Sequence, residues 1–465
     1  MRRNDCPDVV TTLRAEVMRS LAADTPAGEP LVLGLSGGRD STVLLDALAA
    51  LGPAHGRVVT AVHVHHGLSR NADAWARFCG ERCAALAIAC NVRHVDVPRH
   101  PQTSLEAEAR RMRYDALAAA AAHAGARHVL LAHHRDDQAE TLLLQLLRGA
   151  GPHGLAGMPR ARTDARGVTW LRPLLGCSRV DIDAYASAME LSWQDDESND
   201  DSRHLRNALR RTVLPQLAQV FPGHATTLAR AAEHQADAAQ LADDLAAIDA
   251  TRIGDAVTLD CAALAALPQH RARNLLRWFL RQRGLPAPSS ARLAAMLDQL
   301  SAARRDALIR LPHAGCEIGV HRDQVLLHAP VPLTFNVPWH GEPELELPHG
   351  TLAFTHAKGA GIDAAQLAFG VHVRSRAGGE RFQLAADRPR RALKAILREA
   401  GIPPWERRGL PLVFCGSALA AVAGLGIDAA LRAAPGQPGL TIDWHPRIDP
   451  AQSSTPAGVD NPATG

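Results

Sequence analysis

The stretch Leu31–Ser41, which reads LVLGLSGGRDS, decides the fold of this 465-residue chain. Its apolar first half predicts a short buried strand, and the residues after it have the pattern of a helix. Two adjacent glycines between them let successive backbone N–H groups face an anion at close range. The positive end of the following helix favours a phosphate at the same place. The stretch therefore predicts a phosphate-binding loop, made of Ser36, Gly37, Gly38, Arg39, Asp40 and Ser41.

The alternation of strand and helix continues over the next hundred residues. Predicted strands at 31–35, 57–64, 89–97 and 128–132 alternate with predicted helices at 41–51, 71–87, 106–124 and 136–148. This order predicts an α/β fold with a doubly wound, mostly parallel sheet. Ligands of such sheets bind at the carboxyl ends of the strands, which is where the loop lies.

The loop lacks the lysine of a Walker motif, G-x-x-x-x-G-K-[ST]. That lysine serves the β and γ phosphates, so its absence favours cleavage between the α and β phosphates of ATP, with AMP passed to an acceptor. The serine hydroxyls are donors to phosphate, and the Asp40 carboxylate is a suitable ligand for Mg²⁺. A glycine-rich turn with an N-cap serine is the alternative interpretation, and it would suffice for a lone pair of glycines.

A second motif, residues 132–141 (AHHRDDQAET), begins the helix after the fourth strand. Asp137 and Glu140 are three residues apart and share one face of that helix. Acidic residues in a first turn also compensate the helix dipole, but dipole compensation does not explain the nearby His133. Carboxylates beside a phosphate loop can bind magnesium or the ammonium group of an amine substrate.

Two further motifs point to the same edge of the sheet. His63, His65 and His66 end the second strand, where alternation separates His66 from the others and favours nucleotide contact over zinc. Arg113 belongs to a helix that carries Arg110 and Tyr114 on the same side. A salt-bridged surface helix is the alternative there, but an arginine beside the triphosphate would stabilise the charge as pyrophosphate leaves.

The character of the chain changes after Pro215. Helices are predicted at 221–250, 269–284 and 289–300, followed by short alternating runs from Glu317 and a Pro- and Gly-rich hairpin or connection at 338–350. The segment 374–408 has ten Lys/Arg against four Asp/Glu, although the net charge of the chain is only +3. This local excess indicates an anionic macromolecule as partner; a solvated charged face is the alternative.

Cysteine spacing and hydropathy limit the classes of protein to which this chain can belong. The eight cysteines include no C-x-x-C pair, which favours buried reduced thiols over a metal or redox site. There is no signal-peptide pattern and no apolar run of membrane-spanning length. We expect a cytoplasmic protein that does not enter a membrane.

The four motifs, in this order, resemble the tRNA(Ile)-lysidine synthetase family of the PP-loop, or N-type ATP pyrophosphatase, superfamily. The resemblance spans residues from about 30 to 430 and is weakest across the helical middle. It continues in the segments 148–158, 172–175, 193–199, 206–211, 374–380, 393–394, 403–407 and 410–412. At His65, many family members have Asn.

The resemblance implies a ligase that adenylates the wobble cytidine of a CAU-anticodon isoleucine tRNA with ATP. Free L-lysine would then displace AMP and leave lysidine, after pyrophosphate has left in the first step. The implied catalytic residues are Asp40, Arg113, His133, Asp137, Glu140 and Arg206. The implied ATP-binding residues are those of the Ser36–Ser41 loop together with His65, and Asp40 would bind the metal.

The resemblance also implies a domain order. A catalytic PP-loop domain (1–215) would precede a helical tRNA-contacting domain (216–335), a linker or hairpin (336–363) and a basic α/β tRNA-binding domain (364–447). The remaining tail (448–465) is rich in Pro, Ser, Thr and Gly, a composition that predicts disorder. A homodimer is compatible with the sequence, which contains nothing that fixes the oligomeric state.

Three other functions fit parts of the sequence less well. A tRNA thiolase of the same superfamily that uses a cluster or persulfide needs paired cysteines, and a glutamine amidotransferase needs a glutaminase domain. A non-catalytic tRNA- or nucleotide-binding protein has little use for Asp40, Asp137 and Glu140.

Overall fold

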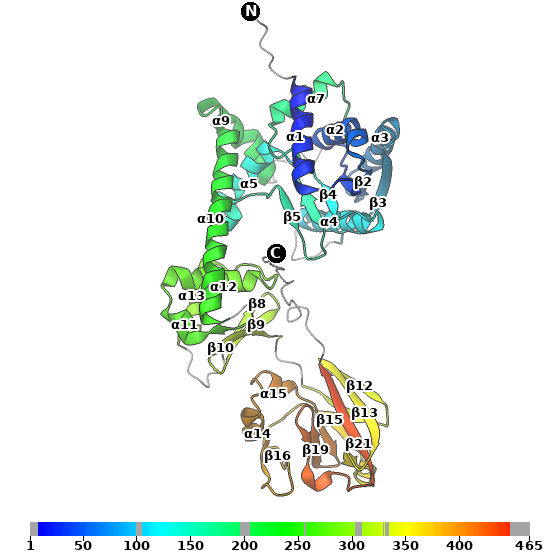
Figure 1. Cartoon of the computed structure of the whole chain (residues 1–465), viewed down its shortest axis with the longest axis vertical. Helices are drawn as coiled ribbons and strands as arrows, with labels where there is room; N and C mark the ends of the chain where they lie inside the picture. Colours follow the sequence, from blue (N-terminus) through cyan, green and yellow to red (C-terminus); the bar gives the residue numbers. More distant parts are fainter. Residues whose placement is uncertain are drawn as a thin grey trace, which may run out of the picture. The chain divides into compact units, whose positions relative to one another are not determined.

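The computed structural model describes residues 8–98, 105–195, 205–254, 257–302, 309–328, 330 and 334–446. The chain divides into two compact units, Met1–Leu241 and Ala242–Gly465 (Figure 1). The predicted disordered tail lies outside the described residues, as do residues 196–204 at the end of one segment of the resemblance. Within the described ranges, no helix is both long enough and apolar enough to span a bilayer.

The first unit is built on a six-stranded sheet with the order β3-β2-β1-β4-β6-β5. All neighbouring strands are parallel except β5, which pairs antiparallel with β6. This confirms the predicted mostly parallel α/β fold. The strands are β1 (Leu31–Gly34), β2 (Val59–His65), β3 (Ala89–His94), β4 (His128–Leu130), β5 (Ala161–Thr163) and β6 (Thr169–Leu171).

Helices cover both faces of this sheet. Leu31 and Leu33 of β1 pack in a core with α1 (Val9–Asp24), α2 (Arg39–His55) and α7 (Arg179–Ala188). Val32, between them, points to the other face and packs in a core with α4 (Leu105–His123). Residues on alternate sides of one strand are thus buried on both faces, as in doubly wound sheets. The remaining helices around the sheet are α3 (Ala72–Ala85), α5 (Arg135–Leu147) and α6 (Pro152–Leu155).

The helix after the phosphate loop begins two residues earlier than predicted. Gly38 is the N-cap, in an extended conformation, and the backbone N–H of Thr42 donates to its carbonyl oxygen at 3.0 Å. Asp40 therefore lies in the first turn of α2, where its negative charge complements the helix dipole.

The first unit ends in a series of short helices that are continuous with one another. They are α8 (Leu205–Ala208), the π-helical turn η2 (Leu209–Val213) and α9 (Leu214–Val220). The long helix α10 (His224–Ile253) follows and runs across the division between the two units. It starts after Pro222 and Gly223, three residues later than the helix predicted at 221–250.

The second unit opens with helices packed on a small sheet, so the prediction of a helical domain was incomplete. The sheet order is β7-β10-β9-β8, and Ile318, Val320 and Val325 share a core with Leu275 and Phe279. The alternating runs predicted from Glu317 correspond to β9 and β10, whereas β7 and β8, of two and four residues, were not predicted. The elements are α11 (Cys261–Ala266), α12 (Gln269–Arg281), α13 (Ser290–Ser301), β7 (Leu259–Asp260), β8 (Arg310–His313), β9 (Cys316–His321) and β10 (Gln324–His328).

The residues predicted to be a linker or hairpin, 336–363, are strands of the C-terminal sheets. Strands β12 and β13 form an antiparallel hairpin, and β11 pairs with β15. Leu345, Leu352 and Ile362 share one buried core with Val373 and Val413, so these residues belong to the C-terminal domain and do not link to it. Proline and glycine were misleading here because they occupy the strand ends and turns of small antiparallel sheets.

The C-terminal domain consists of two main sheets, a two-stranded ribbon and short helices. The sheet orders are β11-β15-β18-β19-β20 and β12-β13-β21-β14, and β16 pairs with β17. Trp405 is buried. The elements are β11 (Asn336–Trp339), β12 (Glu344–Leu347), β13 (Gly350–Lys358), β14 (Ile362–Asp363), η3 (Ala364–Phe369), β15 (Val371–Arg374), β16 (Arg381–Phe382), β17 (Arg391–Ala392), α14 (Leu393–Glu399), α15 (Glu406–Gly409), β18 (Leu412–Cys415), β19 (Ala418–Val422), β20 (Gly426–Ile427), η4 (Ala429–Leu431) and β21 (Pro438–Pro446).

Candidate active site

The serine hydroxyl groups of the Ser36–Ser41 loop form hydrogen bonds within the loop itself. The Oγ atoms of Ser36 and Ser41 lie 3.0 Å apart, and the N–H of Gly38 donates to Ser36 Oγ at 3.3 Å. Ser41 Oγ in turn donates to the Gly38 carbonyl at 2.9 Å. Gly37 has a φ of +87°, a conformation that glycine adopts without strain. The loop after β1 therefore has a fixed shape with glycine where the backbone demands it.

Two buried, uncharged side chains, those of His63 and Cys79, pack against this loop. His63 Nδ1 lies 2.9 Å from the Leu35 carbonyl oxygen, and Cys79 Sγ lies 3.5 Å from the same ring nitrogen. A Cβ atom on Gly37 would approach Cys79 Sγ to 3.1 Å. Burial lowers the pKa of His63 and raises the pKa of Cys79 to about 12, so both groups are uncharged at neutral pH. They pack beneath the loop and shape it.

Asp40 has a carboxylate oxygen that no donor satisfies. Its Oδ1 is buried without a hydrogen-bond partner in the described part of the chain, and Arg39 Nε lies 3.9 Å away. Burial raises the pKa of Asp40, although the nearby His134 opposes that shift. An unsatisfied carboxylate oxygen in the first turn after a phosphate loop fits the donor set of Mg²⁺, which takes one or two carboxylates and completes its shell with water and phosphates. Among the described residues, no three His, Cys, Asp or Glu side chains are grouped to hold a metal without substrate.

His134 begins α5 and links it to Asp40. Its Nδ1 accepts from the N–H of Asp136 at 3.3 Å, while its own N–H donates to Asp137 Oδ2 at 3.0 Å, so the two ends of the turn cap each other. Its Nε2 lies 3.7 Å from Asp40 Oδ2 and 3.6 Å from Asp137 Oδ2. Burial alone would lower the pKa of His134, but the surrounding carboxylates raise it overall. This side chain joins the phosphate loop to the second motif.

Asp137 and Glu140 lie side by side on α5, as predicted, and two arginines bridge them. Arg206 donates to Glu140 Oε2 at 2.8 Å and to Asp137 Oδ1 at 3.0 Å. Arg210 donates to both Glu140 oxygens, at 2.6 and 2.9 Å, and to Asp137 Oδ1 at 3.2 Å. Burial would raise the pKa of Asp137, but His134 and Arg206 lower it overall. We call these four side chains the carboxylate–arginine cluster.

The other predicted site residues differ in what they contact. Burial, aided by nearby arginines, lowers the pKa of His133 to about 3 against the opposing charge of Asp137, so its imidazole is neutral. Arg113 lies on the exposed side of α4, near enough to His63 to lower its pKa. His65 contacts Asp73 at 3.0 Å and its ring lies against His94, and it has no contact with the cluster among the described residues.

The sequence missed two members of the site. His134 stood next to His133 in the motif, and its N-cap position before Asp137 was the signal that could have assigned it. Arg210 follows Arg206 by one helical turn, so it shares a face with a residue already predicted for the site. The π-helical turn at Leu209–Val213, a feature frequent at functional sites, contains Arg210 and has no sequence signal that we recognise.

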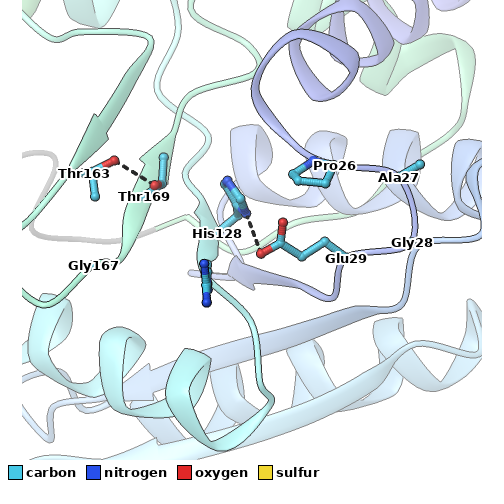
Figure 2. A pocket seen from close by; sticks show the side chains of 9 residues that line it. Pro26, Ala27, Gly28, Glu29, His128, Thr163, Gly167 and Thr169 are labelled. Atoms are coloured by element: carbon cyan, nitrogen blue, oxygen red, sulfur yellow. Dashed lines mark hydrogen bonds and ion pairs between the residues drawn. The ribbon is translucent and has the colours of Figure 1, made fainter. Parts of the chain in front are cut away.

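A separate hollow of about 700 Å³ lies at the opposite edge of the sheet (Figure 2). It is lined by residues before β1 and at the starts of β4 and β6, among them Glu29, His128 and Thr169. His128 Nδ1 lies 3.2 Å from Glu29 Oε1, and Figure 2 shows these two side chains facing each other. The predicted site residues follow the other ends of β1 and β4, so this hollow is not part of the candidate active site.

The basic segment 374–408 is partly neutralised within its own domain. Arg374 and Arg376 lie 3.5 and 3.3 Å from Glu380, and Arg390 lies 2.7 Å from Asp428. In contrast, the exposed Lys394 and Arg398 on α14 have no carboxylate at ion-pair distance in the described ranges. Arg381, Arg388 and Arg408 are also exposed and have no carboxylate at ion-pair distance among the residues that the structure describes, so α14 supplies two of the charges that remain available to a partner.

Family models match three successive parts of the chain. They describe a PP-loop domain over residues 11–217, a TilS substrate binding domain over 259–326 and a TilS substrate C-terminal domain over 371–444. Among solved structures, the U34-tRNA thiolase NcsA from Methanococcus maripaludis is 17% identical with a TM-score of 0.42, over 50% of this chain and 80% of that one. A TILS C-terminal domain is 19% identical with a TM-score of 0.22, over 25% of this chain and all of that one.

Curated relatives match nearly the whole chain. The tRNA(Ile)-lysidine synthase of Nitrosomonas europaea is 44% identical over 92% of this chain and 94% of its own length. Those of Burkholderia pseudomallei and Ralstonia nicotianae are 41% and 42% identical, over 90% and 95% of this chain and 94% and 98% of their own lengths. At this identity and coverage the chain belongs to the tRNA(Ile)-lysidine synthase family.

Proposed function

We propose that this chain converts the wobble cytidine of a CAU-anticodon isoleucine tRNA into lysidine, using ATP and free L-lysine, in the cytoplasm. The observation that carries the proposal is the meeting of Asp40, His134 and Asp137 at one sheet edge, directly after the phosphate loop. Family membership over nearly the full length supports the same substrates, since the curated relatives are named for lysidine formation on isoleucine tRNA.

In the first step, the cytidine C2 oxygen attacks the α-phosphorus of ATP, and the bond to the bridging oxygen of pyrophosphate breaks. The backbone of Ser36–Ser41 would hold the leaving pyrophosphate, with Arg39 at the edge of the loop, His65 beside the nucleotide and Arg113 near the phosphates. Asp40 would bind Mg²⁺, which supplies charge neutralisation at the phosphates when bound. The cytidine must leave the anticodon stack to reach this edge, as in other base-modifying enzymes.

In the second step, the lysine ε-nitrogen attacks C2, the C2–O bond breaks and AMP leaves. Arg206, and with it Arg210, would stabilise the negative charge of the adenylated intermediate. Asp137 and Glu140 would hold the amine, but they already accept six hydrogen bonds, five of them from the two arginines. Two carboxylates offer about eight acceptor positions, so the amine has about two left. The proton that the nitrogen gives up would pass through Asp137 and Glu140 to solvent. His133, whose pKa of about 3 makes it too weak a base for this step, would lie uncharged near the phosphates.

A non-catalytic RNA- or nucleotide-binding protein is the second candidate. Such a protein would need the phosphate loop and the basic segment 374–408. It would not need the Asp40 carboxylate, which has a buried oxygen without a hydrogen-bond donor. The unsatisfied Asp40 Oδ1 costs stability unless a ligand uses it, and this favours the enzyme.

The test is incorporation of radiolabelled lysine into CAU-anticodon isoleucine tRNA by the purified protein with ATP and Mg²⁺. We expect incorporation by the wild type, a loss of about 100-fold or more in Asp40→Ala, and no change in Asp298→Ala, whose exposed side chain lies on α13. A tRNA with the wobble cytidine replaced serves as the substrate control. No incorporation by the wild type, or full activity of Asp40→Ala, would overturn the proposal.

A further inference from the structure

Arg172, directly after β6, is a buried arginine without a carboxylate. Its side chain belongs to a residue only 5% exposed, and its Nη1 donates to the Pro159 carbonyl at 2.7 Å. Its Nε is buried with no hydrogen-bond partner, and no described Asp or Glu lies at ion-pair distance. Arg206 and Arg210, in contrast, share two carboxylates. A buried charge without a counterion lowers the stability of the folded protein. This indicates that Arg172 binds an anion at this place.

The neighbours of Arg172 add positive charge and a hydroxyl donor. Tyr114 hydrogen-bonds to it, and Arg110 lies over the Tyr114 ring with its Nη2 3.4 Å from the hydroxyl oxygen. Burial lowers the pKa of Arg172; Tyr114 opposes this shift, and Arg162 and Arg110 add to it. Arginines that crowd together without an acid repel one another, and a bound anion would remove that repulsion.

This group of arginines adjoins the candidate active site. Arg172 lies near enough to His133 to lower its pKa, and Asp137 lies near enough to oppose that shift. In the sheet, β4 lies between β1 and β6, so Arg172 and the phosphate loop follow strands on opposite sides of β4. A substrate between them would meet a phosphate site on one side, the carboxylates of α5 in the middle and Arg172 on the far side.

We propose that Arg172, with Arg110 and Tyr114, binds the α-carboxylate of the lysine substrate while its ε-amine faces Asp137 and Glu140. This assignment rests on the proposed function and adds to it the recognition of free lysine. A planar guanidinium matches a carboxylate with two parallel hydrogen bonds. A phosphate of ATP already has the loop after β1, and a phosphate of the RNA backbone is the other anion that the experiment must distinguish.

A purely structural role for Arg172, as a support for the loop that contains Pro159, explains less. Gln138 already anchors that loop, donating to the Met158 carbonyl at 3.0 Å and accepting from the Met158 N–H at 2.7 Å. The contact to Pro159 uses only Nη1, which leaves the buried Nε unexplained.

The test compares lysine with lysinamide, which keeps both amines and replaces the carboxylate by a neutral amide. With saturating ATP and tRNA, Arg172→Gln should lower kcat/KM for lysine about 10- to 100-fold, the range for loss of a hydrogen bond to a charged group. It should leave kcat/KM for lysinamide within about twofold, so that the preference for lysine collapses. Arg172→Lys should recover part of the preference for lysine over lysinamide. If Arg172→Gln does not fold, the comparison of Arg172→Lys with the wild type provides the test.

Arg160→Gln is the matched control, since Arg160 pairs in the backbone with Arg172 but its side chain is satisfied by Glu16 and Asp24. It should keep the preference for lysine. Pyrophosphate release without lysine should be unchanged in Arg172→Gln, because adenylation precedes amine attack. The assignment is overturned if Arg172→Gln still prefers lysine over lysinamide. It is also overturned if kcat/KM falls equally for lysine and lysinamide, or if pyrophosphate release falls, because these results point to a phosphate or a structural role. A wild type that makes no lysidine overturns the proposed function instead.

Discussion

Gly37 is constrained by its backbone angle and by the thiol beneath it. Its φ is +87°, and an added Cβ would lie 3.1 Å from Cys79 Sγ. Left-handed backbone costs a non-glycine residue about 1 to 2 kcal/mol, and the contact adds to that cost. We expect Gly37→Ala to raise the KM for ATP about tenfold or more while the Kd for tRNA is unchanged, measured by steady-state kinetics and filter binding.

Gly56 supplies the control for this prediction. It ends α2 with a φ of +60°, but an added Cβ there would meet nothing within 4 Å. Gly56→Ala should lower the melting temperature and leave the KM for ATP unchanged. If both alanine variants affect the KM equally, the constraint at Gly37 is not specific to the loop.

His133 gives the site a pH-dependent stability. Its pKa falls to about 3 in the folded protein, mainly through burial, so the unfolded chain binds a proton below about pH 6.5 that the folded protein does not. The free energy of unfolding must therefore decrease as the pH falls through this range. Between pH 7.5 and 5.5 the contribution of His133 is up to about 1.4 kcal/mol. Urea unfolding should show a smaller loss over this interval in His133→Gln, and an identical loss would contradict the prediction.

At the scale of elements, the contact between α5 and the segment Leu205–Val213 depends on a buried charge. Glu140 is 1% exposed and takes two of its hydrogen bonds from Arg210. Arg210→Gln leaves that carboxylate undercompensated, which should lower the free energy of unfolding by about 3 kcal/mol. Adding Glu140→Gln should recover about 1 to 3 kcal/mol, because the two residues are directly coupled. Arg391→Gln, which breaks an exposed pair with Glu399, should cost less than about 1 kcal/mol; strict additivity at Glu140 and Arg210 would contradict the coupling.

The same two elements show what the sequence could and could not predict. The start of α5 and the shared face of Asp137 and Glu140 follow from spacing alone, because they depend on one helix. The pairing of Glu140 with Arg210 joins residues 70 positions apart, and no local pattern encodes it. The strands at 336–363 were predicted to be a linker or a hairpin region, and only the hairpin alternative holds, for β12 and β13. Their local composition was misleading, and only pairing with β15 and β21 makes them part of a sheet.

For the whole molecule, the question is where a long RNA is bound while one base is modified. The net charge of +3 gives no general attraction for RNA, so binding must depend on local surfaces. Within the basic segment, ion pairs with Glu380 and Asp428 use several arginines internally. Lys394 and Arg398 lie one helical turn apart on α14 and are exposed, so they are placed to contact neighbouring phosphates.

The double variant Lys394→Glu/Arg398→Glu should weaken tRNA binding and reduce its salt dependence. Each phosphate contact contributes about one unit to the slope of log K against log salt concentration, so the slope should decrease by about two. Lys358→Glu reverses one charge, half the change of the double variant, at the exposed end of β13 in the same domain but outside the segment, and should alter the slope little. Pyrophosphate release at saturating tRNA should be unchanged, since these side chains are far along the chain from the loop and act only through binding. Equal slopes for the two charge-reversed proteins would place the RNA on another surface.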